Sequence, residues 1–494
     1  MKYVALAIAL VLMLGATAGA SARPNVLFVC VDDMNDWVSC LGGYGLKAHT
    51  PNIDRLAGRG TLFTAAYCTS PKCGPSRAAV LTGLRPTTTG IYDNVQWLRP
   101  HRPDVKTIPQ HFLAGGYYVA GAGKVCHHTA GNNPPDQWSE FFDQVYDDPW
   151  DRPDRTNYPR VVVTDPPPGF PFNGITPHQH EMDWGSPPLE ESKYGDVQAT
   201  DWIIRRLADQ RDRPFFLAAG LFHPHLPWLC PPRYFDAVDP ASVVLPPIKE
   251  DDADDLPAAA RALIRPQRLE LAKRFGKQAE SIHAYLSAIA FADAQVGKLL
   301  DALDESGQAD DTVVVFWSDH GWHHGEKGHW MKSTLWERAT RVPLVIVAPG
   351  VTQPGTRCDR PVNLLDLYPT LIELCELEAK PELEGASLVP LLADPAAKWE
   401  RPSVTTWRRG NHAVRDERYR YIRYHDGSEE LYDHQSDPHE WTNLADRREH
   451  AALKQRLARW MPATEVDPAP GKDAYQFDLK SYTWTRKSDG KRLQ

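Results

Sequence analysis

The sequence predicts an α/β protein, with a large mixed, mostly parallel sheet sandwiched by helices and a smaller C-terminal α+β subdomain. Three observations support this fold class. The chain has 494 residues, more than one ordinary hydrophobic core holds. Short apolar runs typical of buried strands alternate with segments that are apolar at helical spacing. After about Pro390 the pattern changes to short segments rich in aromatic and β-branched residues, which favour antiparallel strands.

The large sheet is predicted from apolar runs that are separated by helical segments. The predicted strands are Asn25–Val31, Tyr117–Ala120, Pro214–Ala219, Thr312–Trp317 and Pro343–Val347. The predicted helices are Ala199–Leu207, Ser281–Leu303 and Pro361–Leu374. Strands that alternate with helices indicate a mainly parallel sheet with both faces covered. Ligands of such sheets bind outside the carboxyl ends of the strands.

The sequence predicts three parts: a signal peptide at residues 1–22, an α/β domain at 23–390 and a C-terminal α+β subdomain at 391–494. In the last part, Val414–Tyr424 and Glu430–Asp433 predict strands of a four-stranded sheet, and Ala451–Trp460 predicts a helix. Between Asp147 and Pro188 there are ten prolines, which predict a long ordered loop. Such a loop is either a functional lid or a plain surface excursion.

The N-terminus has the three parts of a secretory signal: Lys2, the apolar run Val4–Leu14 and the small residues Ala20-Ser21-Ala22. A membrane anchor is the alternative, but the apolar run is short for a spanning helix, and no later stretch is apolar enough to span a bilayer.

The chain has no Asn-x-Ser/Thr glycosylation acceptor, which favours a bacterial periplasmic or secreted protein over a lysosomal one. A formal net charge of −9 argues against a nucleic-acid-binding surface.

The eight cysteines are scattered and form no Cys-x-x-Cys pair, so zinc-finger and redox motifs are excluded. An exported chain can form disulfides. If one of the eight cysteines is chemically modified, seven remain, so at least one thiol stays unpaired. Cys30 lies within an apolar strand pattern and is predicted to be a buried thiol.

Acidic and basic residues follow four of the predicted strands, which places them at the same edge of the sheet. The residues after these strands are Asp32-Asp33, Gly123-Lys124-Val125-Cys126-His127, His223-Pro224-His225 and Ser318-Asp319-His320-Gly321. Three carboxylates at one edge repel one another unless a cation lies between them. Oxygen ligands favour Ca²⁺ or Mg²⁺ over zinc, although His320 is an unusual ligand for a hard cation.

The segment from Cys73 to Gly83 predicts a helix, because Pro75 suits a first turn and Gly83 suits a helix end. Cys73 then lies at the helix N-terminus, where free N–H groups favour an anion. Arg77, one turn further, adds a positive fork. The sequence therefore predicts an oxyanion site here, the alternative being a buried structural cysteine.

Cys73-Gly74-Pro75-Ser76-Arg77, followed by Leu81-Thr82-Gly83, resembles the signature of the formylglycine-dependent sulfatases of the alkaline phosphatase-like superfamily. In that family a formylglycine-generating enzyme oxidises the cysteine to formylglycine. The iduronate-2-sulfatase branch is resembled by Ser318–Trp322, Gly325–Gly328 and Trp330–Lys332. The resemblance covers essentially the whole mature chain.

The resemblance implies a role for each matching residue. The implied ligands of one divalent cation, with Ca²⁺ favoured and Mg²⁺ as the alternative, are Asp32, Asp33, residue 73, Asp319 and His320. The hydrate of the formylglycine made from Cys73 would attack sulfur, with its ionised hydroxyl favoured by the cation and Arg77. Lys124 and Lys332 would neutralise the sulfate oxygens. His225 would protonate the leaving alcohol, and His127 would deprotonate the remaining hydroxyl so that sulfate leaves.

The implied substrate is a sulfated saccharide, most specifically a 2-O-sulfated uronate in a glycosaminoglycan or algal polysaccharide. One departure affects sugar recognition: His223 stands where the iduronate-2-sulfatase branch usually has a substrate-side lysine. Two alternatives remain. Some phosphodiester and phosphonate monoester hydrolases of this fold also carry formylglycine, and a catalytically silent sugar-binding relative would have lost site residues, none of which is missing here.

Overall fold

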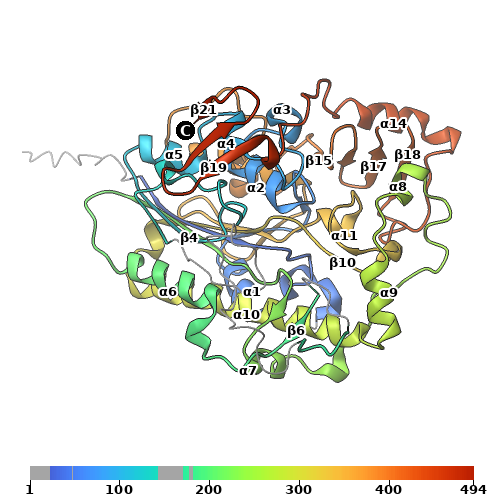
Figure 1. The fold of residues 1–494 in the computed structure, drawn as a ribbon, viewed down its shortest axis with the longest axis horizontal. Helices are drawn as coiled ribbons and strands as arrows, with labels where there is room; N and C mark the ends of the chain where they lie inside the picture. The colour runs from blue at the N-terminus through green and yellow to red at the C-terminus, as the bar shows by residue number, and fades with distance from the viewer. Residues whose placement is uncertain (1–22, 47, 143–170, 177–181, 494) are drawn as a thin grey trace, which may run out of the picture.

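The computed structural model describes residues 23–46, 48–142, 171–176 and 182–493 (Figure 1). The predicted signal peptide and most of the predicted proline-rich loop lie outside the described residues. In the part of the chain that is described, no helix combines the length and apolar character needed to cross a bilayer.

An eight-stranded sheet forms the centre of the molecule. Its strands, in spatial order, are β13 (Thr356–Cys358), β2 (Thr61–Phe63), β12 (Leu344–Val347), β9 (Thr312–Ser318), β1 (Asn25–Val31), β7 (Phe215–Gly220), β4 (Tyr118–Gly123) and β5 (Glu140–Phe142). The run from β9 to β5 is parallel, whereas β12 pairs antiparallel with both β9 and β2. The sheet is therefore mixed and mostly parallel, as predicted.

Helices cover both faces of this sheet (Figure 1). One face packs against α1 (Pro51–Ala57), α6 (Gly195–Leu207) and the long α10 (Gln278–Glu305). The other packs against α2 (Cys73–Thr82), α5 (Ile108–Ala114) and α12 (Leu367–Leu374). Alternation along β1 explains the two cores, because Leu27 and Val29 face one core while Val26 and Phe28 face the other.

Shorter elements connect these layers. The helices are α3 (Pro86–Thr89), α4 (Leu98–His101), α7 (Pro232–Asp236), α8 (Ala258–Arg261), α9 (Gln267–Arg274), α11 (Glu337–Thr340) and α13 (Val389–Ala393). The strands are β3 (Ala66–Tyr67), β6 (Trp184–Gly185), β8 (Trp228–Leu229), β10 (His323–His324), β11 (Trp330–Met331) and β14 (Val362–Asn363).

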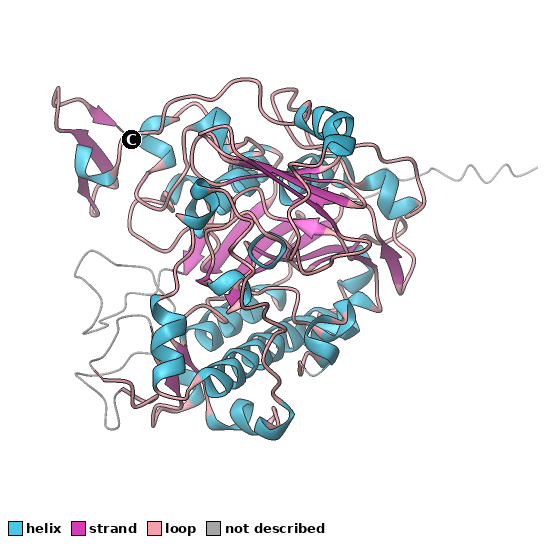
Figure 2. Ribbon diagram, turned by 90° about the vertical axis from the view of Figure 1, so that its right-hand side faces the viewer, coloured by secondary structure: helices cyan, strands magenta, loops and turns pink. Residues whose placement is uncertain are grey.

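The C-terminal part contains the predicted four-stranded antiparallel sheet, formed by β15 (Ser403–Thr406), β16 (His412–Arg415), β17 (Tyr419–Arg423) and β18 (Glu429–Asp433). Helix α14 (Ala451–Ala458) follows it. A further three-stranded sheet, which the sequence analysis did not predict, comprises β19 (Tyr475–Asp478), β20 (Thr483–Arg486) and β21 (Arg492–Leu493). It lies beside α4 and α5, away from the four-stranded sheet, as Figure 1 and Figure 2 show. The domain boundary at residue 390 stays a prediction.

Several predicted elements differ in their bounds from those observed; the helix predicted at Ala199–Leu207, for example, begins at Gly195. The strand predicted at Tyr117–Ala120 runs from Tyr118 to Gly123. The helix predicted at Pro361–Leu374 begins only at Leu367, after a short 3-10 turn, because Val362 and Asn363 pair with β3. The side chain of Asn363 also caps the turn by accepting a hydrogen bond from the N–H of Leu365. All eight cysteines are free thiols, and Cys30 is buried as predicted.

Candidate active site

Four neighbouring strands deliver the predicted site residues to one edge of the sheet. In spatial order these are β9, β1, β7 and β4, all parallel. Asp319 follows β9, Asp32 and Asp33 follow β1, His225 lies in the turn after β7, and Lys124 follows β4. The expectation from strand ends is therefore confirmed, since their carboxyl ends meet at the edge where α/β sheets bind ligands.

The three aspartates form a fully buried group, each 0% exposed. Asp33 has a left-handed backbone, with φ of 65°, and this turn brings its carboxylate to the same side as that of Asp32. The backbone N–H of Asp33 donates to Oδ1 of Asp319 at 3.1 Å. From α10, the hydroxyl of Tyr285 donates to the carbonyl of Asp33 at 2.7 Å. The adjacent acids are thus held together by backbone geometry.

Two carboxylate oxygens in this group, Oδ1 of Asp32 and Oδ2 of Asp33, are buried without a hydrogen-bond partner. Burial raises the pKa of Asp32, and it raises that of Asp33 to about 8 against the opposing effect of Lys332. One ligand atom from each of Asp32, Cys73, Asp319 and His320 lies within 4.8 Å of the others. Buried oxygens left without donors, with mainly oxygen ligands around them, fit a hard divalent cation.

His320 is oriented as a ligand. Its Nδ1 lies 3.1 Å from the carbonyl of Gly321, and because a carbonyl only accepts, Nδ1 carries the proton. Nε2 therefore presents its lone pair to the cluster, 3.4 Å from Oδ1 of Asp33. Burial also lowers the pKa of His320, which keeps the ring neutral.

Cys73 is the first residue of α2, and Gly83 ends that helix in the left-handed conformation, as predicted. The helix is fixed to β9 because the hydroxyl of Ser76 donates to the carbonyl of Asp319 at 2.6 Å. Sγ of Cys73 lies 3.1 Å from Nζ of Lys332 and 3.3 Å from Nε2 of His320. The side chain of residue 73 therefore lies between the carboxylates and a buried ammonium group.

Three buried cationic side chains, Lys332, Lys124 and Arg77, each pair with a different aspartate of this group. Nζ of Lys332 lies 2.5 Å from Oδ1 of Asp33, and although burial alone would lower its pKa, Asp33 and its neighbours raise it. Lys124 pairs with Asp32. The guanidinium of Arg77 binds Asp319 at 2.9 Å and donates to the carbonyls of β1 and of the turn after β4. Arg77 thus holds the carboxylates in place, whereas the sequence analysis expected its fork to face the oxyanion.

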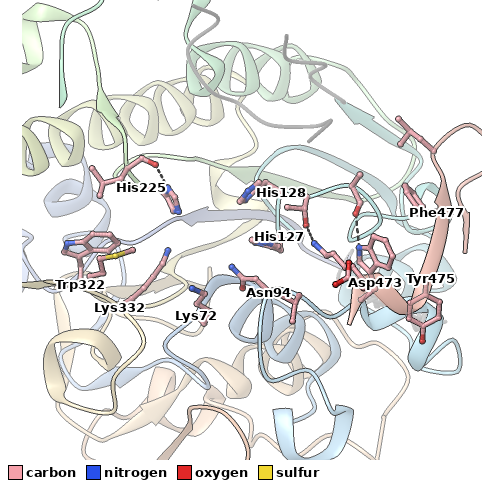
Figure 3. Close-up of a pocket in the computed structure, with 18 of the residues that line it drawn as sticks. Lys72, Asn94, His127, His128, His225, Trp322, Lys332, Asp473, Tyr475 and Phe477 are labelled. Atoms are coloured by element: carbon pink, nitrogen blue, oxygen red, sulfur yellow. Dashed lines mark hydrogen bonds between the residues drawn. The ribbon is translucent and has the colours of Figure 1, made fainter. Parts of the chain in front are cut away.

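A cavity of about 650 Å³ opens over this edge of the sheet. In Figure 3, His225, His127 and His128 line it on one side, with Lys332, Lys72 and Asn94 opposite. Nδ1 of His225 bonds the carbonyl of Leu226 at 2.5 Å, and its Nε2 lies 3.7 Å from Oδ2 of Asp33. Burial, and next the charge of Lys124, lower the pKa of His127 well below its ordinary value. His127 is therefore neutral near pH 7 and able to accept a proton.

One expectation of the sequence analysis is wrong. His223, expected on the substrate side, is only 2% exposed and is absent from the cavity lining. Its Nδ1 bonds Asp196 at 2.8 Å and its Nε2 bonds the carbonyl of Leu229 at 3.0 Å. With both ring nitrogens satisfied, His223 braces the turn that carries His225.

Several contributions to the cavity were missed, Arg268 among them. Lys72 directly precedes Cys73, so its position in the chain was a usable signal. Asn94 accepts a hydrogen bond from the N–H of Gly74 at 2.7 Å and so covers the start of α2. Residues 472–487 line the far end of the cavity, and no local pattern connects them to a site almost 400 residues earlier.

Comparisons with known proteins agree with this geometry. The family model named Sulfatase matches residues 24–377, and the model for the C-terminal part of N-sulphoglucosamine sulphohydrolase matches residues 325–467. A sulfatase of Formosa agariphila is 37% identical over 456 residues, covering 90% of this chain and 87% of that protein. Human iduronate 2-sulfatase is 31% identical over 397 residues, covering 72% and 70%.

Solved structures show the same fold. The phosphonate monoester hydrolase of Silicibacter pomeroyi superposes with a TM-score of 0.72 at 24% identity, covering 89% of this chain and 94% of that one. The first family model spans more than half of the chain and includes the strand-end aspartates, Cys73 and Lys332. The chain therefore belongs to the sulfatase family and is a sulfuric ester hydrolase.

Proposed function

We propose that this enzyme removes sulfate from a sulfated sugar, specifically a 2-O-sulfated uronate, through a formylglycine hydrate made from Cys73. One observation carries the proposal: the first residue of α2 is a buried cysteine that contacts Lys332 and His320, beside carboxylate oxygens that lack hydrogen-bond partners. A nucleophile made there has a helix N-terminus and fixed cations around it, which stabilise negative charge as it develops.

Asp32, Asp33, Asp319 and His320, with residue 73, would hold one divalent cation, which we propose is Ca²⁺. When bound, it supplies positive charge for the sulfate oxygens and favours the ionised form of the nucleophile. Lys332 adds an ammonium group that the surrounding carboxylates keep protonated. Arg77 keeps Asp319 ionised, and Lys124 pairs with Asp32 and opposes the effect of burial on its pKa.

His225 and His127 divide the proton transfers. In the first step an oxygen of residue 73 bonds to sulfur, the sulfur–alkoxide bond breaks, and His225 gives its proton to the departing alcohol. In the second step His127 takes the proton from the remaining hydroxyl, sulfate leaves and the aldehyde re-forms. The lowered pKa of His127 suits the second role, because a base must be neutral before it acts.

The assignment of a uronate rests on similarity to human iduronate 2-sulfatase, at 31% identity. We further propose that the chain is exported to the periplasm or secreted, and that a formylglycine-generating enzyme acts on it during maturation. Both follow from the sequence features at residues 1–22 and 73–77.

The test is mass spectrometry of the peptide containing residue 73, after expression with a formylglycine-generating enzyme, combined with a desulfation panel. Formylglycine at residue 73 and preferential release of 2-O-sulfate from uronates are the expected results. A fully active protein with an unmodified thiol would overturn the mechanism. Preference for another sulfate position would overturn the uronate assignment alone.

A second candidate is hydrolysis of phosphonate monoesters or phosphodiesters, supported by the fold shared with the Silicibacter pomeroyi enzyme. The same nucleophile and cation would serve that reaction. The two candidates are separated by comparing kcat/KM for 4-nitrophenyl sulfate, phenyl phosphonate monoesters and bis(4-nitrophenyl) phosphate. A much higher value for the phosphorus esters would favour the second candidate.

A further inference from the structure

The charge of the cavity lining is opposite to that of the whole chain. The lining includes five cationic side chains and one carboxylate, Asp473, while the chain as a whole carries a formal charge of −9. The cationic residues are Lys72, Arg268, Lys332, Lys472 and Lys487. Local positive charge in an acidic protein attracts an anionic ligand to this cavity in particular. A volume of about 650 Å³ is also far more than one sulfate group fills.

The far end of the cavity is built by the C-terminal three-stranded sheet. Lys472, Tyr475, Phe477, Leu479 and Lys487 belong to it or to its approach. Figure 3 shows Asp473, Tyr475 and Phe477 at the end away from Lys332 and His225. These residues lie beyond residue 467, where the second family model ends. This wall is therefore a feature of the chain that the matched family models do not include.

The sheet is firmly attached to the loops of the site. Gly471 forms a bridge with Gln96, and the N–H of Lys472 donates to the carbonyl of Val95 at 2.7 Å. The N–H of Asn133 donates to the hydroxyl of Tyr482 at 2.9 Å, close to the loop that carries His127. Trp484 is 0% exposed and packs against Trp97. The wall therefore has a fixed position relative to the site.

The groups on this wall suit a second sugar residue. Phe477 offers a half-buried ring. Nζ of Lys472 lies 5.5 Å from the centre of the Trp97 ring and donates a hydrogen bond to the hydroxyl of Thr129. Lys487 is exposed at the rim. A lysine presents a compact charge with three donors, so these cations can bind the oxygens of an anionic group such as a sulfate ester.

We propose that the C-terminal three-stranded sheet forms a subsite for a second sulfate group, carried by the sugar next to the one that is desulfated. This inference rests on the proposed function only for the identity of the reacting sugar. The subsite makes a multiply sulfated saccharide a better ligand than a singly sulfated one.

The test compares two disaccharides with the same 2-O-sulfated unsaturated uronate. In one the neighbouring sugar is N-sulfated glucosamine, and in the other it is N-acetylglucosamine. The test variant is Lys472→Met with Lys487→Met, since methionine keeps the unbranched stem and removes the charge. The matched control, Lys480→Met with Lys491→Met, removes two exposed lysines of the same segment that do not line the cavity.

We expect the wild type to favour the disulfated compound in kcat/KM by about tenfold, the test variant to lose most of this preference, and the control to keep it. Equal preference in the wild type and the test variant would overturn the subsite. The same comparison of Kd by calorimetry, in a Cys73→Ala background, needs no turnover. If the wild type releases no sulfate but the binding preference depends on Lys472 and Lys487, the proposed function fails and the subsite stands. If Kd is the same for both compounds, the subsite fails.

Discussion

Two clusters in this molecule are built from the same kinds of residue. The strand-end cluster contains Asp32, Asp33, Asp319 and His320 beside Cys73, and the junction cluster contains Glu337, His434 and Glu440. The junction cluster lies between α11 and the four-stranded sheet, and Arg420 of β17 is in contact with both of its glutamates. From composition and spacing alone, both clusters could hold a metal ion.

The clusters differ in how their carboxylate oxygens are satisfied. In the junction cluster, Arg420 pairs with Glu440 at 2.6 Å and also with Glu337. The N–H of Glu337 donates to Glu440 at 2.9 Å, and the hydroxyl of Tyr67 donates to Glu337 at 3.1 Å. The strand-end cluster instead has two buried carboxylate oxygens without a hydrogen-bond partner. Unsatisfied oxygens, and not the residue types, therefore distinguish a cation site from an ion-pair network.

The pKa directions express the same difference. Burial raises the pKa of Asp32 and Asp33. In Glu337 and Glu440 burial acts in the same direction, but His434 and Arg420 outweigh it and lower the pKa. In Asp319 the charge of Arg77 outweighs burial and lowers the pKa. Asp32 and Asp33 therefore need an added cation to ionise fully, whereas the junction cluster carries its own.

The largest expected effect is loss of activity when the strand-end cluster loses one charge. Asp33→Asn should lower kcat/KM by roughly 10⁴-fold, about 5.5 kcal/mol, because a cation ligand and the partner of Lys332 are removed together. Sulfate release and bound metal content measure this. The matched variant Glu337→Gln should keep its turnover per folded molecule, and near-normal activity of Asp33→Asn would contradict the assignment of the cluster.

The second-largest expected effect is a loss of stability when the junction cluster loses its arginine. Arg420→Met should lower the free energy of unfolding by about 3–5 kcal/mol, because it leaves two buried carboxylates without their cation. Urea denaturation measures this. Arg418→Met is the control: it breaks the pair between the exposed Arg418, which directly precedes β17, and Asp433 at the end of β18, and it should change stability far less. Similar losses in the two variants would show that the junction cluster is not a buried network.

Much of the difference between the strand-end cluster and the junction cluster could not be predicted from the sequence. Strand ends and the Cys73 segment predicted where Asp32, Asp319 and His225 meet, because parallel strands bring distant residues to one edge. In the junction cluster Glu337 is at least 83 positions from the residues that it contacts, Arg420 and Glu440, and neither Glu337 nor Arg420 follows a predicted strand. The buried state of His223 depends on Asp196 in α6, and the wall at residues 472–487 depends on packing against Trp97. These are tertiary contacts without a local signal.

The third effect is stabilisation by bound calcium, which should depend on the strand-end cluster and not on the junction cluster. Calcium at about 100 times its Kd should stabilise the wild type by about 2.7 kcal/mol, since it binds the folded state alone. The increase should disappear in Asp33→Asn and persist in Glu440→Gln. Calorimetric melting with and without chelator measures it. An increase that disappears in Glu440→Gln and not in Asp33→Asn would place the ion in the junction cluster instead.

The smallest effect is the pH dependence of the junction cluster. The folded-state pKa of Glu337 lies well below the ordinary value of 4.5, because His434 and Arg420 outweigh burial. Below pH 4.5 the unfolded chain therefore binds a proton that the folded chain does not, so the stabilisation by Glu337 is present above that pH and is lost as pH falls through the folded-state pKa. The stability difference between wild type and Glu337→Gln should shrink by about 1.4 kcal/mol per pH unit in that range. Chemical denaturation of both proteins between about pH 3 and 7 measures it. A difference that stays constant with pH would mean that Glu337 is not held ionised by its neighbours.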